Sequence, residues 1–158
     1  MKNNWLKNYA PPGLDMDKEK SSWILCIIIS TLWCMQFLFR YFDYRSLLFE
    51  TKPGTGKKIL IEGAKMPNFE FLTKDLFEVF GIVIVFCALV VVYHYYYHYQ
   101  GSKMMYLMKR LPNKWEVHIR CFTLPVVASV ITFVYMVVLR MLFYAIYLWC
   151  TPAQCLTL

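Results

Sequence analysis

Residues 79–102, VFGIVIVFCALVVVYHYYYHYQGS, contain no Asp, Glu, Lys or Arg. Because an α-helix rises about 1.5 Å per residue, a helical run of this length can cross the hydrocarbon layer of a membrane, which is about 30 Å thick. Residues 21–39 and 121–139 also lack these charged residues. Helices of this length in soluble proteins normally present a polar face to water. The sequence therefore predicts three transmembrane helices.

The composition of the whole chain agrees with a membrane protein. Of its 158 residues, 59% are hydrophobic and 17% are charged, whereas a soluble domain is about half apolar and about a quarter charged. Residues 1–21 carry several charges and two prolines, and they contain no short apolar run that ends in a small-residue cleavage site. We therefore expect the first membrane helix to be retained. The predicted fold class is an all-α, polytopic membrane protein.

The loops divide the chain into seven expected segments. These are a cytoplasmic N-terminal segment (1–21), a helix (22–42), an outer loop (43–75), a helix (76–98), a cytoplasmic loop (99–121), a helix (122–149) and an outer tail (150–158). In the outer loop, runs typical of β-strands at 47–50 and 58–62 flank a Pro-Gly turn and predict a hairpin. In the cytoplasmic loop, Asn113 as N-cap and Glu116 three residues later predict a short interfacial helix. We expect Pro125 to separate this short helix from the third membrane helix.

The distribution of basic residues predicts the orientation, because short cytoplasmic loops accumulate Lys and Arg. With the N-terminus inside, the cytoplasmic segments hold Lys2, Lys7, Lys18, Lys20, Lys103, Lys109, Arg110, Lys114 and Arg120. The outer loop holds fewer, namely Arg45, Lys52, Lys57, Lys58, Lys65 and Lys74. We therefore expect a cell-membrane protein with a cytoplasmic N-terminus and an extracellular C-terminus. The net charge of +7 suits contact with anionic membrane lipid and requires no nucleic acid.

The sequence offers no set of residues for enzyme chemistry. Residues 51–58 look like a nucleotide-binding P-loop, but Thr51 stands where that motif needs glycine and Lys58 where it needs Ser or Thr. Ser, His and carboxylate residues do not converge in any segment. We therefore expect no enzymatic activity, no cofactor and no ATP site.

His94 and His98 are spaced so that they share one helix face, a geometry that can hold a metal ion. They lie in the run YHYYYHY at one end of a predicted span. Tyrosine concentrates at membrane interfaces, where the ring is apolar and the hydroxyl reaches water. No Asp or Glu is near them in the sequence, so we interpret the run as an interfacial aromatic belt. Metal or haem ligation by the two histidines is the alternative.

Two further pairs of residues are candidates for structural links. Glu78 and Arg140 are an acid and a base expected in the outer half of the membrane, and ionisable groups there usually have partners or line water. We predict an ion pair, with a transport site as the alternative. Cys150 and Cys155 are expected outside, where oxidation can occur. A disulfide and two free thiols both remain open for this pair.

Residues 106–121, YLMKRLPNKWEVHIRC, form a basic segment opened by Leu-Pro between the second and third predicted spans. This segment resembles the cytoplasmic loop of type-2 ABC exporter permeases. The region from the histidines to residues 151–155 also resembles small uncharacterised Gram-positive membrane proteins associated with ABC transporter operons. The first resemblance implies a coupling helix that docks on an ATP-hydrolysing subunit through Arg110, Leu111, Pro112, Trp115, Glu116, His118 and Ile119. A generic interfacial helix is the alternative interpretation.

The resemblance covers only the second and third spans and their loop, and permeases of that family usually have six spans. It implies a small transmembrane subunit of a bacterial ABC-type exporter that couples to a separate ATP-binding subunit. Its other partners would be membrane lipid and either a further permease subunit or a second copy of itself. The alternative function is a stand-alone accessory protein, for immunity to or sensing of membrane-active peptides. A haem or metal oxidoreductase is a third alternative, which depends on His94 and His98 alone.

Overall fold

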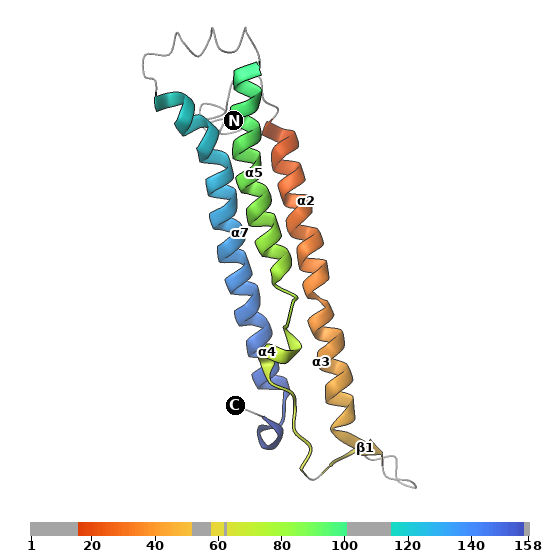
Figure 1. Cartoon of the computed structure of the whole chain (residues 1–158). Helices are drawn as coiled ribbons and strands as arrows, with labels where there is room; N and C mark the ends of the chain where they lie inside the picture. The colour runs from red at the N-terminus through yellow and green to blue at the C-terminus, as the bar shows by residue number, and fades with distance from the viewer. Residues whose placement is uncertain (1–15, 52–57, 62, 101–114, 157–158) are drawn as a thin grey trace, which may run out of the picture. The chain divides into compact units, whose positions relative to one another are not determined.

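The computed structural model describes residues 16–51, 58–61, 63–100 and 115–156. Its helices are α2 (Met16–Cys34), α3 (Gln36–Leu47), α4 (Phe69–Leu72), α5 (Glu78–Gln100), α7 (Trp115–Cys150) and a short 3-10 helix, η1 (Ala153–Cys155) (Figure 1). Three helical segments are long and apolar enough to cross a membrane: Asp17–Leu47, Glu78–Tyr96 and Cys121–Cys150. The prediction of three such helices is confirmed.

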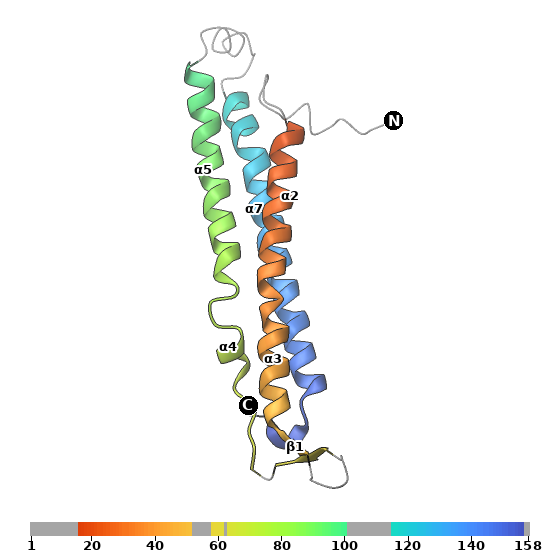
Figure 2. The ribbon, with the colours of Figure 1, turned by 90° about the vertical axis from the view of Figure 1, so that its right-hand side faces the viewer.

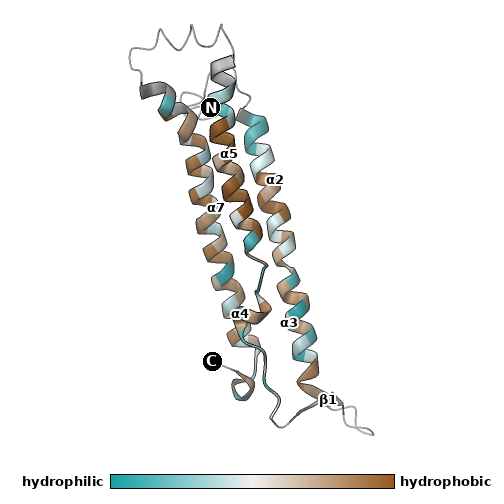
Figure 3. Cartoon of the chain, in the orientation of Figure 1, coloured by the Kyte–Doolittle hydropathy of each residue, from teal (hydrophilic) through white to brown (hydrophobic). Residues whose placement is uncertain are grey.

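Apolar residues cover most of the length of α5 and α7, as the brown colour in Figure 3 shows. A segment of this composition in lipid must satisfy its backbone hydrogen bonds internally, and a helix does so. Polar residues appear where α2 begins, at Asp17–Lys20. Between α2 and α3 the chain departs from the helix only at Met35, whose N–H still donates to the carbonyl oxygen of Thr31 at 3.1 Å.

The expected break at Pro125 is absent, because α7 runs through this proline. Residues from Trp115 onward are therefore the first turns of α7, and the prediction of a separate short helix is wrong. A proline inside a helix lacks the N–H that would bind the carbonyl four residues earlier. Here that carbonyl belongs to Cys121, and its oxygen lies 3.2 Å from His94 Nδ1. A side chain from another helix thus replaces the missing backbone donor.

The chain divides into two compact units. Unit 1 comprises Met1–Ile29 and Phe80–Val134, and unit 2 comprises Ser30–Val79 and Tyr135–Leu158. In unit 1 the parts of α2, α5 and α7 lie side by side (Figure 1, Figure 2). The indole N–H of Trp23 donates to the buried hydroxyl of Thr132 at 3.0 Å, which links α2 to α7. This hydroxyl in turn donates to the carbonyl of Ala128 at 2.8 Å.

Unit 2 has an aromatic core. The Phe37 ring stacks on Phe143 with centroids 4.7 Å apart, and it meets Phe69 edge-on at 5.9 Å. Tyr41 stacks beside Phe37, and its hydroxyl lies 3.2 Å from the hydroxyl of the buried Thr151. Aromatic pairs in these geometries add stability beyond the area that they bury. The core of this unit therefore joins α3, α4 and the second half of α7.

Backbone contacts in unit 2 hold the connection before α4 and the segment after α7. The Tyr147 hydroxyl donates to the carbonyl of Pro67 at 3.0 Å, and the Met66 N–H donates to the carbonyl of Cys155 at 2.9 Å. Strands β1 (Phe49–Thr51) and β2 (Lys58–Leu60) pair antiparallel, with Phe49 opposite Leu60. The predicted hairpin is confirmed.

Candidate functional site

A buried hydrogen-bonded set links the three helices of unit 1. His94 on α5 has no exposed surface. Its Nδ1 lies 3.2 Å from the carbonyl oxygen of Cys121 on α7, and its Nε2 lies 2.7 Å from Glu19 Oε1 on α2. We call these three residues the His94 node. A single imidazole ring thus joins elements that are far apart in the sequence.

The carbonyl partner of His94 fixes the position of one proton in the His94 node. A carbonyl oxygen only accepts hydrogen bonds, so Nδ1 of His94 carries a hydrogen and donates it to Cys121. The bond between Nε2 and Glu19 then holds one proton, which can be on either atom. An imidazolium can donate to a carboxylate, or a neutral imidazole can accept from a carboxylic acid.

The burial of the second carboxyl oxygen of Glu19 lowers the stability that the His94 node provides. Oε2 is buried and has no hydrogen-bond partner among the residues that the structure describes, whereas nearly all buried polar atoms in proteins have one. A buried polar atom without a partner costs free energy, and a charged one costs more. The contact between Oε1 and His94 is what offsets the burial of this side chain.

A second polar contact fixes the first turns of α7. The hydroxyl of Tyr95 lies 2.6 Å from Nδ1 of His118, and the Tyr95 ring meets Phe122 edge-on with centroids 5.9 Å apart. His118 belongs to the segment that the sequence assigned to partner docking. Ile119 of the same segment is exposed.

The rest of the docking segment is described only in part. Trp115 and Glu116 belong to α7, but their side chains lie outside the described part of the structure, and so do Arg110, Leu111 and Pro112 altogether. The prediction that all seven residues form one docking surface therefore stays a prediction.

His94 does not behave as the sequence suggested. It is fully buried, whereas its neighbours Tyr93 and Tyr96 are exposed. The interfacial aromatic belt therefore stays a prediction for the tyrosines, and His94 does not share their exposed surface. The side chain of His98 is outside the described residues. Within the described part of the chain, no group of three or more His, Cys, Asp or Glu residues could hold a metal ion.

Glu19 and Cys121 are partners of His94 that the sequence did not predict. Glu19 is 75 residues away in the chain, and a backbone carbonyl leaves no trace in residue identity. One signal was available: Pro125 in the third span frees the carbonyl of Cys121, which then needs a donor from another helix. A histidine side chain can supply such a donor.

The other two predicted pairs are placed as follows. Glu78 and Arg140 both have exposed side chains, and no ion pair joins them among the residues that the structure describes. A long basic side chain that faces outward can extend along apolar surface toward an interface. Cys150 and Cys155 are free thiols, the first exposed and the second buried, which is one of the two alternatives left open for them.

The residues of the His94 node are the best-defined candidate site of this chain, because buried ionisable groups in membrane helices are expensive and mark functional positions.

Comparisons with known proteins assign neither a function to this site nor a family to the fold. No family model, no curated protein and no solved structure matches the chain.

Proposed function

We propose that this protein is a small transmembrane subunit of an ABC-type exporter, without its own ATP site, that couples to a separate ATP-hydrolysing subunit. The observation that supports the proposal is the attachment of the first turns of α7 to the other helices of unit 1. The His94 node fixes the backbone of α7 at Cys121, and Tyr95 fixes it at His118.

This attachment gives the docking segment a mechanical role. A partner that binds near Trp115 and moves the start of α7 pulls on Cys121 and His118. Because His94 and Tyr95 both belong to α5, the displacement passes to α5, and through Glu19 it passes to α2. A segment that merely floated at a membrane surface would need no such polar links.

The exposed surface of the same turns suits a protein partner. Ile119 and Phe122 are exposed on α7, and three-residue spacing puts them on one face of the helix, which Trp115 extends by one turn. Large aromatic residues at the centre of an interface often contribute about 2 kcal/mol or more to binding. Trp115 is therefore the proposed anchor.

The proposed orientation can be tested by cysteine labelling of intact cells with a reagent that does not cross membranes. We expect a cysteine introduced at Gly54 to react from outside and one introduced at Asn113 to stay protected, because basic residues favour a cytoplasmic position for the second. The native cysteines are first replaced with alanine. Labelling at Asn113 from outside would contradict both the orientation and the coupling to a cytoplasmic ATPase.

The coupling itself can be tested by co-purification in mild detergent. We expect the double variant Trp115→Ala, Glu116→Lys to lose the ATP-binding subunit that copurifies with the wild-type protein, since it removes the anchor and reverses a charge. Trp149→Ala is the matched control, because Trp149 is a tryptophan on the same helix with 88% of its surface exposed, and it should retain the partner. Membrane levels of all three proteins should be equal. Unchanged co-purification of the double variant would remove the assignment.

The accessory-protein function remains the second candidate, and contacts in unit 2 favour it. Tyr147 and Cys155 bind the chain at Met66 and Pro67, so the connection before α4 is held in a defined conformation that an external partner can recognise. If the wild-type protein copurifies with no ATPase at all, this function replaces the first.

A further inference from the structure

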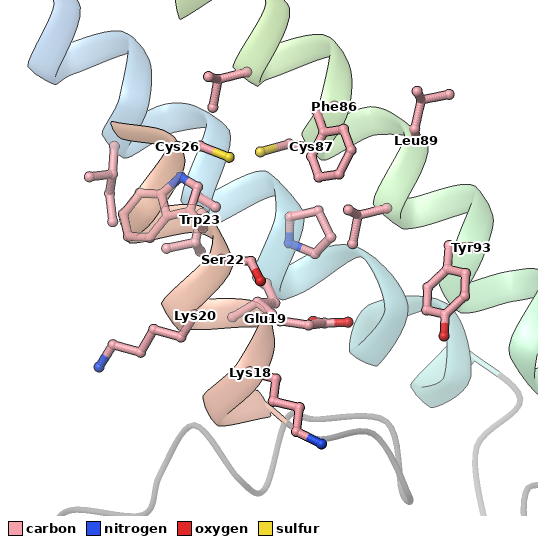
Figure 4. A pocket seen from close by; sticks show the side chains of 17 residues that line it. Lys18, Glu19, Lys20, Ser22, Trp23, Cys26, Phe86, Cys87, Leu89 and Tyr93 are labelled. Atoms are coloured by element: carbon pink, nitrogen blue, oxygen red, sulfur yellow. The ribbon is translucent and has the colours of Figure 1, made fainter. Parts of the chain in front are cut away.

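A groove of about 580 Å³ lies in unit 1, between α2, α5 and α7 (Figure 4). Its walls are formed by Trp23 and Cys26 of α2, by residues from Val83 to Tyr93 of α5 and by residues from Leu124 to Ile131 of α7. The side chains of Cys26 and Cys87 point toward one another across it (Figure 4). Phe86, Leu89, Val127 and Ile131 are exposed although they line the groove, so it is open to its surroundings.

The two ends of the groove differ in polarity. Lys18, Lys20 and Ser22 lie at the end where α2 begins, and all three side chains are exposed. The first turn of α2 holds two acids: Asp17, which is not among the lining residues, and Glu19, whose Oε1 atom lies 2.7 Å from His94 Nε2. The other end is lined by apolar residues and by cysteines. The groove therefore has a basic mouth and an apolar interior.

The length of the groove matches one leaflet of a bilayer. Its lining extends along α5 from Val83 to Tyr93, which is about 15 Å at the rise of an α-helix. This is half of a hydrocarbon layer about 30 Å thick. An acyl chain that hangs from a headgroup at the basic mouth would fill the groove along its length.

We propose that this groove binds one acyl chain of an anionic phospholipid, whose headgroup lies at the end of the groove that Lys18 and Lys20 line. The volume is in the range of ordinary small-molecule sites, which are mostly apolar with a few polar groups that fix the orientation of the ligand. The basic mouth selects an anionic headgroup over a zwitterionic one.

Trp23 provides a reporter inside the groove. Its ring is a wall residue, and its N–H is held by Thr132. Brominated acyl chains quench tryptophan fluorescence on contact, so a variant with Trp23 as its only tryptophan reports which lipid occupies the groove. This variant carries Trp5→Phe, Trp33→Phe, Trp115→Phe and Trp149→Phe. The companion variant keeps only Trp33, which is exposed and does not line the groove.

The measurement compares phosphatidylglycerol and phosphatidylcholine, each brominated in the acyl chains and added in trace amounts to vesicles of unbrominated phosphatidylcholine. A basic residue near an anionic lipid surface strengthens binding by about fivefold. We therefore expect Trp23 to be quenched by phosphatidylglycerol at a mole fraction at least about fivefold lower than by phosphatidylcholine. Trp33 should show no such preference. Equal quenching of Trp23 by the two lipids would overturn the proposal.

Two substitutions separate a lipid in the groove from anionic lipid gathered by charge alone. Lys18→Gln with Lys20→Gln should abolish the preference, whereas Lys2→Gln with Lys7→Gln, which removes the same charge from the N-terminal segment of the sequence, should retain it. Ala128→Phe fills the groove without any change of charge and should also abolish the preference. A preference that survives Ala128→Phe, or that disappears equally with Lys2→Gln and Lys7→Gln, would show that the groove is not the binding site.

Discussion

Replacement of His94 with leucine is expected to lower the free energy of unfolding by about 3 kcal/mol, because a buried polar group that loses its hydrogen-bond partner costs about 1–3 kcal/mol and the substitution removes the partner of two such groups. The leucine leaves two groups without partners: the carboxyl group of Glu19 and the carbonyl of Cys121. The unfolding free energy is measured by titrating the protein from mild detergent into dodecyl sulfate. Tyr96→Leu on the same helix is the control, and because Tyr96 is exposed it should change stability little.

The contributions of the two partners can be separated with further substitutions. The double variant His94→Leu, Glu19→Leu has no buried carboxyl group, so only the Cys121 carbonyl remains unsatisfied, at a cost of about 1–3 kcal/mol. Pro125→Ala then supplies a backbone N–H four residues after Cys121 and should recover much of this remaining loss. A loss of less than about 1 kcal/mol for His94→Leu alone, or an identical loss with and without Pro125, would contradict the energetic role of the node.

Replacement of Phe37 with alanine is expected to destabilise unit 2 by about 3 kcal/mol, as large-to-small changes in packed cores do. Phe37 is fully buried, and its ring contacts Tyr41, Phe69 and Phe143. Lipid is as apolar as phenylalanine, so in a membrane this loss comes from the cavity and the missing van der Waals contacts. The readout is the same unfolding titration.

Phe39 provides the matched control for this substitution. It lies on the same helix two residues later, and 72% of its surface is exposed. Phe39→Ala should therefore leave the unfolding free energy nearly unchanged, because no protein cavity forms. If the two variants were equally stable, the aromatic core would contribute nothing measurable to the fold.

The sequence by itself determined the three long apolar helices and the hairpin of β1 and β2. Both depend on local properties of the chain. A run without charged residues that is long enough to cross a membrane can be recognised by counting consecutive residues in the sequence. A hairpin needs two strand-forming runs around a Pro-Gly turn, which are also neighbours in the sequence.

The His94 node, the continuity of α7 through Pro125 and the groove of unit 1 could be found only in the tertiary structure. In α5 apolar residues occur on every side of the helix, so periodicity does not indicate which face meets a neighbour. Proline normally interrupts a helix, and it is tolerated here because another helix supplies the hydrogen-bond donor that Cys121 lacks. Such a donor can be found only after α2, α5 and α7 have been placed side by side, since Glu19, His94 and Cys121 come from three different helices.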